Sequence, residues 1–116
     1  MPEVSIATLI PRAADIPELR TLVARIEETY SPEAVLLFGS RAKGTARPDS
    51  DWDCLVLLPD GADEALLDPA LGFDTARGSG VYADVLCAFS REFLRDVAVA
   101  NTLAREIVGY AVRIGR

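Results

Sequence analysis

The sequence contains no histidine among its 116 residues, and this absence excludes several classes of catalytic site. Ser-His-Asp hydrolases, histidine-ligated zinc sites and histidine-dependent ribonucleases all require an imidazole. Any catalysis by this chain must therefore use carboxylates, metal ions, Arg or Lys side chains, or backbone groups.

Cysteine is also scarce, and long apolar runs are missing. Cys54 and Cys87 lie singly in apolar segments without CxxC spacing, which predicts two buried free thiols in a reducing cytosol. No apolar run approaches the ~18 residues that a membrane span needs, and residues 1–9 lack the basic start of a signal peptide. We therefore expect a cytoplasmic protein that does not associate with membranes.

Positively charged residues are also few. Twelve Lys and Arg residues stand against eighteen Asp and Glu residues, so the net charge is −6, which disfavours binding to a nucleic-acid backbone. The only lysine, Lys43, lies close to Arg41 and Arg47. By itself such a cluster is typical of a solvated loop.

The length and the apolar pattern predict a single domain over residues 1–116, with a small mixed β-sheet backed by helices, an α/β (α+β) fold. Asp15 and Glu18 resemble a capping box at the start of the first helix, and Pro69 interrupts a short helical segment. Residues 72–80 are expected to form a loop. The expected helices cover 16–30, 62–71, 91–98 and 102–113, with a helical turn at 41–44, and the expected strands cover 34–38, 52–58 and 81–87.

Three aspartates carry the first indication of chemistry. Asp51 and Asp53 are two residues apart, so in a strand both carboxylates project from the same face. Asp84 lies inside a later apolar run, where an isolated ionised carboxylate is costly. The compensation is either a salt bridge to an arginine such as Arg41 or Arg105, or convergence of the three carboxylates on Mg²⁺.

A phosphate-binding pattern precedes the aspartates. Gly39 directly follows a buried strand, where glycine permits a close approach, and Ser40 offers a hydroxyl and a backbone N–H to an anion. Arg41 and Lys43 add charge complementary to phosphate. By itself the dipeptide also fits an ordinary strand-to-helix turn with a serine cap. Its combination with the aspartates on consecutive strands favours a site for a metal-bound phosphate.

These residues resemble a known family. Gly39-Ser40, the ten residues 41–50 and Asp51-Trp52-Asp53 are similar to the G-S-x10-D-x-D signature of the polymerase β-like nucleotidyltransferases. The string GSRAKGTARPDSDWD resembles the minimal nucleotidyltransferase subfamily in particular, and Asp84 fits the position of the family's third carboxylate. The resemblance extends from about residue 16 to residue 110 and includes the Gly109-Tyr110 segment.

The resemblance implies a two-metal nucleotidyl transfer. Asp51 and Asp53 would bind two Mg²⁺ ions, and Asp84 would hold the catalytic ion and help to remove the acceptor proton. Ser40 would contact the β- and γ-phosphates of ATP, with Gly39 giving clearance, and Arg41 and Lys43 are weaker candidates for the same contact.

The resemblance also implies a partner. Small proteins of this kind resemble the antitoxins of HEPN–MNT toxin–antitoxin pairs, which transfer AMP to a tyrosine of a HEPN ribonuclease. That ribonuclease uses an Arg-x4-His motif, so a chain without histidine would be the antitoxin, expected in a hetero-oligomer with the toxin. Two alternatives stay open: an antitoxin that neutralises its partner by binding alone, and a nucleotidyltransferase subunit acting on a small molecule such as an antibiotic.

Overall fold

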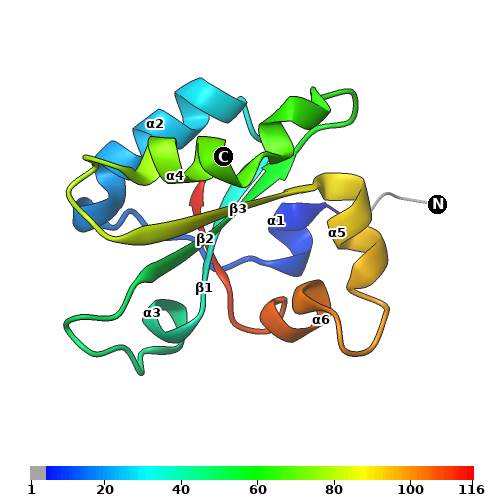
Figure 1. The fold of residues 1–116 in the computed structure, drawn as a ribbon. Coiled ribbons are helices and arrows are strands. Elements are labelled where there is room, and N and C mark those ends of the chain that lie inside the picture. The colour runs from blue at the N-terminus through cyan, green and yellow to red at the C-terminus, as the bar shows by residue number, and fades with distance from the viewer. Residues whose placement is uncertain (1–4) are drawn as a thin grey trace.

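A four-stranded mixed sheet lies between two layers of helices, in the order β3-β2-β1-β4. The computed structural model describes residues 5–116. Figure 1 shows α2 and α4 on one face of the sheet and α1, α5 and α6 on the other. β2 and β3 run parallel, whereas β1 is antiparallel to β2 and to β4. The predicted fold class is therefore confirmed.

The elements follow one another along the chain as α1 (Ile6–Leu9), a 3₁₀ turn (Pro17–Leu19), α2 (Arg20–Tyr30), β1 (Ala34–Phe38), α3 (Ser40–Lys43), β2 (Trp52–Leu58), a second 3₁₀ turn (Glu64–Leu67), α4 (Pro69–Ala76), β3 (Ala83–Phe89), α5 (Ser90–Asp96), α6 (Leu103–Ile107) and β4 (Val112–Gly115). No helix in residues 5–116 is long and apolar enough to cross a membrane.

The two central strands are apolar on both faces because helices cover both. In β1, Val35 and Leu37 pack toward α2, whereas Ala34 and Leu36 belong to the cluster with α1, α5 and α6. β2 alternates in the same way, and every residue from Cys54 to Leu58 is buried. The continuous apolar runs in the sequence follow from this double coverage.

The start of the first long helix differs from the prediction. The chain enters α2 through the 3₁₀ turn at Pro17–Leu19, and the side chain of Asp15 forms no cap. Asp15 instead accepts two hydrogen bonds from Arg20, at 3.1 and 3.0 Å. This ion pair is exposed, so its contribution to stability is small.

The expected loop at 72–80 is wrong for its first half, which belongs to α4. Pro69 occupies the first turn of that helix, where a missing N–H costs nothing, so it begins the helix instead of interrupting one. Gly72 is in the helix because α4 packs very closely on β3: a Cβ there would lie 2.5 Å from the carbonyl oxygen of Val85. The sequence pattern showed the glycine but not the neighbouring strand.

The C-terminal segment also differs from the prediction. The expected helix over 102–113 ends at Ile107, and Val112–Gly115 pairs with β1 as the fourth strand. The third strand is displaced by two residues and covers Ala83–Phe89. A short apolar segment near the end of a chain fits helix and strand patterns about equally well, and pairing with β1 decides between them here.

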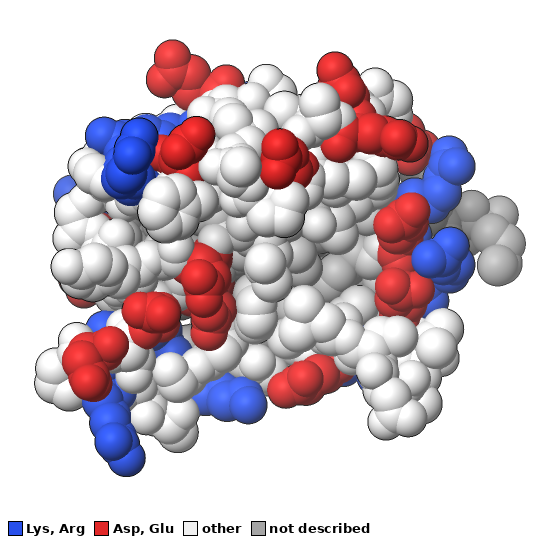
Figure 2. Space-filling model, in the orientation of Figure 1, with Lys and Arg blue, Asp and Glu red and all other residues white. Residues whose placement is uncertain are grey.

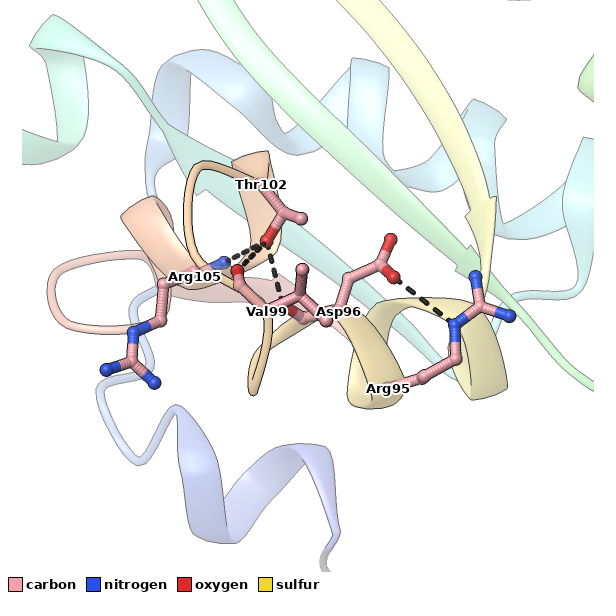
Figure 3. Close-up of polar contacts among 5 residues, drawn as sticks. All are labelled: Arg95, Asp96, Val99, Thr102 and Arg105. Carbon is pink, nitrogen blue, oxygen red and sulfur yellow. Dashed lines mark hydrogen bonds and ion pairs between the residues drawn. The ribbon is translucent and has the colours of Figure 1, made fainter.

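Thr102 braces the junction between α5 and α6 (Figure 3). Its hydroxyl lies 2.7 Å from the carbonyl oxygen of Asp96 and 3.0 Å from that of Val99, and it accepts a hydrogen bond from the backbone N–H of Arg105 at 3.1 Å. One side chain therefore caps α6 and ties it to the end of α5.

We expect Thr102→Val to lower the free energy of unfolding by about 1–2 kcal/mol, because it removes the cap and leaves carbonyl acceptors short of a donor. Urea unfolding followed by circular dichroism measures the change. The exposed Thr21 on α2 provides a matched control, and Thr21→Val should change stability by less than about 0.5 kcal/mol. Equal effects at both positions would contradict the bracing role.

Both cysteines are free thiols, as predicted, although only Cys54 is fully buried and Cys87 is half-buried. Burial raises the pKa of Cys54 to about 12 and also raises the pKa of Cys87. Because the thiolate is the reactive form, both thiols should react slowly with DTNB at pH 8, Cys54 the slower. Both should react rapidly in denaturant. Fast labelling of Cys54 in the native protein would contradict its burial.

Candidate active site

Gly39 forms the turn between β1 and α3 and lies against the carboxylate of Asp53. Its φ of 73° and ψ of −161° fall in a region that is essentially restricted to glycine. A Cβ at this position would also overlap the Oδ2 atom of Asp53. Two independent constraints therefore require glycine here, and Ser40 begins α3 directly after the residue that contacts Asp53.

Asp53 and Asp84 are direct neighbours across the parallel pair of strands. The register places Asp53 of β2 beside Asp84 of β3 on one side and Phe38 of β1 on the other. Adjacent strands lie about 4.8 Å apart, so the two carboxylates share one face of the sheet at short range. Burial raises the pKa of Asp53, and the charges of Asp84 and Asp51 raise it further.

The environment of Asp84 differs from the one expected. The side chain is exposed, and β3 is the outer strand of the sheet. It forms no salt bridge among residues 5–116, so neither Arg41 nor Arg105 compensates its charge. Exposure to water removes the desolvation cost that the apolar run suggested.

Divalent cations fit this set of donors. Carboxylate oxygens are the ligands that Mg²⁺ prefers. Burial first, and then repulsion from Asp84 and Asp51, raise the pKa of Asp53, and a cation would relieve that repulsion. Asp53 and Asp84 form a cross-strand pair that could bind a cation. The exposed Asp51 lies just before the start of β2. Within residues 5–116, no three acidic or thiol side chains are grouped closely enough to hold one ion together.

Arg41 is engaged with the loop that leads to the aspartates. Its guanidinium donates to the carbonyl oxygen of Ser50 at 2.8 and 3.2 Å and to that of Pro48 at 3.1 Å, and it lies 4.4 Å from the ring centroid of Trp52. In this arrangement Arg41 positions the segment that carries Asp51. Its predicted contact with phosphate stays a prediction.

Tyr110 also contacts the glycine turn, a role that the sequence analysis does not assign to it, although Gly109-Tyr110 is part of the family resemblance. Its hydroxyl accepts a hydrogen bond from the backbone N–H of Gly39 at 3.2 Å, and Nζ of Lys43 lies 4.8 Å from its ring centroid. The C-terminal segment thus supports both the glycine turn and the lysine. The sequence signal was slight, a tyrosine beside a glycine after an apolar segment.

We expect Tyr110→Phe to lower the free energy of unfolding by about 1 kcal/mol, because the Gly39 N–H loses its partner while the ring beside Lys43 remains. Tyr110→Leu should cost more, since the ring is lost as well. Thermal unfolding of the two variants beside the wild type measures the difference. If Tyr110→Phe and Tyr110→Leu are equally stable, the ring does not contribute.

A glycine turn beside carboxylates on two adjacent strands of a mixed sheet is the arrangement of the polymerase β-like nucleotidyltransferase fold. The family model described as "Nucleotidyltransferase domain" matches residues 19–113 of the chain. The chain therefore belongs to the nucleotidyltransferase domain family, and transfer of a nucleotidyl group is its expected class of reaction. The comparisons with curated proteins and with solved structures found no match.

Proposed function

We propose that this protein transfers AMP from ATP to a tyrosine of a HEPN-type ribonuclease toxin and acts as its antitoxin. The observation that carries the enzymatic part is the contact between the Gly39 turn and Asp53, with Asp84 beside Asp53 in the sheet. This contact joins the turn that we propose for phosphate binding to the carboxylates that we propose for cation binding. Membership of the nucleotidyltransferase family supports the same reaction.

The proposed reaction breaks the phosphoanhydride bond between the α- and β-phosphates of ATP and forms a phosphate ester bond to the tyrosine. The tyrosine oxygen attacks the α-phosphorus of ATP, a new oxygen–phosphorus bond forms, and the bond to the bridging oxygen of the β-phosphate breaks, so that pyrophosphate leaves. Asp84 accepts the tyrosine proton, and Ser40 and the Gly39 turn hold the terminal phosphates. Bound Mg²⁺ would activate the attacking oxygen and stabilise the charge of the leaving group.

Several properties support a protein acceptor. The net charge of −6 disfavours a nucleic-acid acceptor. The chain lacks the histidine that the ribonuclease of such a pair requires, which assigns it to the antitoxin side. Six large apolar side chains are exposed in residues 5–116, which is consistent with a protein-binding surface.

Intact-mass spectrometry tests the proposal. The product of the adjacent reading frame, if it is a small helical protein with an Arg-x4-His motif, is incubated with this protein and Mg-ATP. We expect a mass gain of one or more AMP units, with the modification on a tyrosine. The Asp53→Asn variant should give no gain.

The same experiment separates the two alternative functions. A stable complex with unchanged masses, together with neutralisation that survives Asp53→Asn, would show inhibition by occlusion. If no complex forms and no mass changes, the toxin–antitoxin proposal is overturned. The search for an acceptor then turns to small molecules.

A further inference from the structure

We infer that the cavity over Leu86, two residues along β3 from Asp84, is the acceptor subsite, and that it takes an extended segment carrying an apolar side chain next to a Lys or Arg. This inference rests on the proposed function, because it names what the acceptor presents to the same site. The cavity has a volume of about 370 Å³. Its lining includes Leu55 and Leu86 of the sheet, Phe93 of α5 and Ala104 of α6.

The floor of the cavity continues the face of the sheet that carries the catalytic pair. Along β2 and β3 the Asp53–Asp84 pair is followed two residues later by the Leu55–Leu86 pair. Side chains two residues apart in a strand share a face and lie about 7 Å apart. A side chain seated over Leu86 is therefore within one or two residues' reach of Asp84.

The apolar lining of the cavity is left uncovered by the chain itself. Leu67, Leu86 and Leu103 all line it and are 38%, 47% and 41% exposed. Half of the large exposed apolar side chains in residues 5–116 thus gather at one cavity. An uncovered apolar concavity next to reactive groups is typical of a ligand site.

The rim of the cavity is acidic. Asp68, Glu92 and Asp96 line it, and its lining contains no Lys or Arg. Asp96 is partly neutralised by Arg95 at 3.3 Å, whereas Glu92 forms no salt bridge among residues 5–116. Figure 2 shows this face with an uncharged, hollowed area at its centre and acidic groups around it. This charge favours a basic segment and opposes an acidic one.

The surrounding elements suit an extended segment. β3 is an outer strand of the sheet, so the cavity opens along a strand edge instead of being closed by a neighbouring strand. The wall of the cavity opposite β3 is formed by α5 and α6, which hydrogen bonds of Thr102 connect. A segment lying along this edge would place one side chain in the cavity and a nearby hydroxyl at Asp84.

Nuclear magnetic resonance of the full-length protein with two synthetic peptides tests the subsite directly. The probes are the capped pentapeptides Lys-Leu-Tyr-Leu-Lys and Glu-Leu-Tyr-Leu-Glu. We expect the basic peptide to shift the amide signals of Leu86, Phe93 and Ala104 and to bind at least ~10-fold more tightly than the acidic one, with the difference falling in high salt. Equal binding, no binding at millimolar concentration, or shifts confined to α2 would overturn the inference.

Matched variants locate the effect. Glu92→Gln and Leu103→Gln should each weaken binding of the basic peptide by ~5-fold or more. The controls are Glu106→Gln, which removes an acidic group outside the cavity, and Phe73→Gln, which removes an apolar group that is 69% exposed elsewhere. Neither control should change binding by more than ~2-fold. Equal losses in controls and cavity variants would overturn the inference.

Kinetics with the proposed toxin keep the two hypotheses apart. The cavity variants should raise the KM for the protein acceptor while the KM for ATP stays within ~2-fold of wild type. If the wild-type protein transfers no AMP to the toxin, the proposed function fails, and the peptide titration still decides the subsite. If transfer occurs with unchanged KM values in the cavity variants, the subsite is wrong and the function stands.

Discussion

Replacing Asp53 by Asn should abolish nucleotidyl transfer while leaving a fully folded protein. The substitution removes the charge of the carboxylate that lies between the Gly39 turn and Asp84. Loss of this cation ligand should reduce kcat/KM by at least ~10³-fold, equivalent to about 4 kcal/mol of transition-state stabilisation. Release of pyrophosphate in the presence of the acceptor measures the activity. Activity within ~10-fold of wild type would contradict the assignment.

The stability of the same variant provides the control. Burial and the neighbouring carboxylates raise the pKa of Asp53, so the folded protein binds this proton more tightly than the unfolded chain. Ionisation of Asp53 therefore destabilises the wild type as pH rises through the unfolded pKa and then the folded one. Asp53→Asn should lose this part of the pH dependence and unfold at the same or a higher temperature near pH 7. A lower melting temperature would mean that the carboxylate stabilises the fold.

Gly39→Ala should be the most damaging single substitution in the turn. Alanine must adopt a backbone conformation that is essentially restricted to glycine, and its Cβ would overlap Oδ2 of Asp53. We expect a loss of about 2–4 kcal/mol in the free energy of unfolding, together with loss of transfer activity because Asp53 is displaced. Urea unfolding measures the first effect, and pyrophosphate release measures the second.

Gly44 supplies the matched control for this prediction. It also has a positive φ, of 77°, but nothing lies within 4 Å of the position of its Cβ. Gly44→Ala should therefore show backbone strain alone, about 1 kcal/mol, with activity retained. The difference between the losses of unfolding free energy in Gly39→Ala and Gly44→Ala measures the cost of the steric overlap with Asp53. In the Gly39→Ala/Asp53→Ala double variant that cost should disappear, and strictly additive effects would contradict the overlap.

The sequence predicted the central strands because their signals are local and unambiguous. Ala34–Phe38 and Trp52–Leu58 are short apolar runs bounded by turn residues, and both are confirmed with the same limits. Gly39, Ser40 and Asp53 were found as candidates because their spacing is fixed by one strand–turn–strand unit. Their catalytic roles stay predictions for the experiments described above.

The remaining features depend on contacts between distant segments, which spacing does not encode. The sequence predicts a loop at Gly72 because the group that requires glycine there, the carbonyl oxygen of Val85, lies on a later strand. Tyr110 accepts a hydrogen bond from Gly39 although the two residues are 71 positions apart in the sequence. Val112–Gly115 is a strand only because it pairs with β1. Asp84 was expected in a core because the sequence does not show that β3 is the outer strand.

The pairing of β4 with β1 also determines when the protein can work during its synthesis. β1 and Gly39 leave the ribosome early. The edge of β1 cannot pair until Val112–Gly115 has been made, and the N–H of Gly39 has no partner until Tyr110 has been made. The surroundings of the Gly39 turn are therefore completed only after the residues up to Gly115 have been translated. A nascent chain stalled before residue 110 would carry all three aspartates and still lack the hydrogen bond that supports the Gly39 turn.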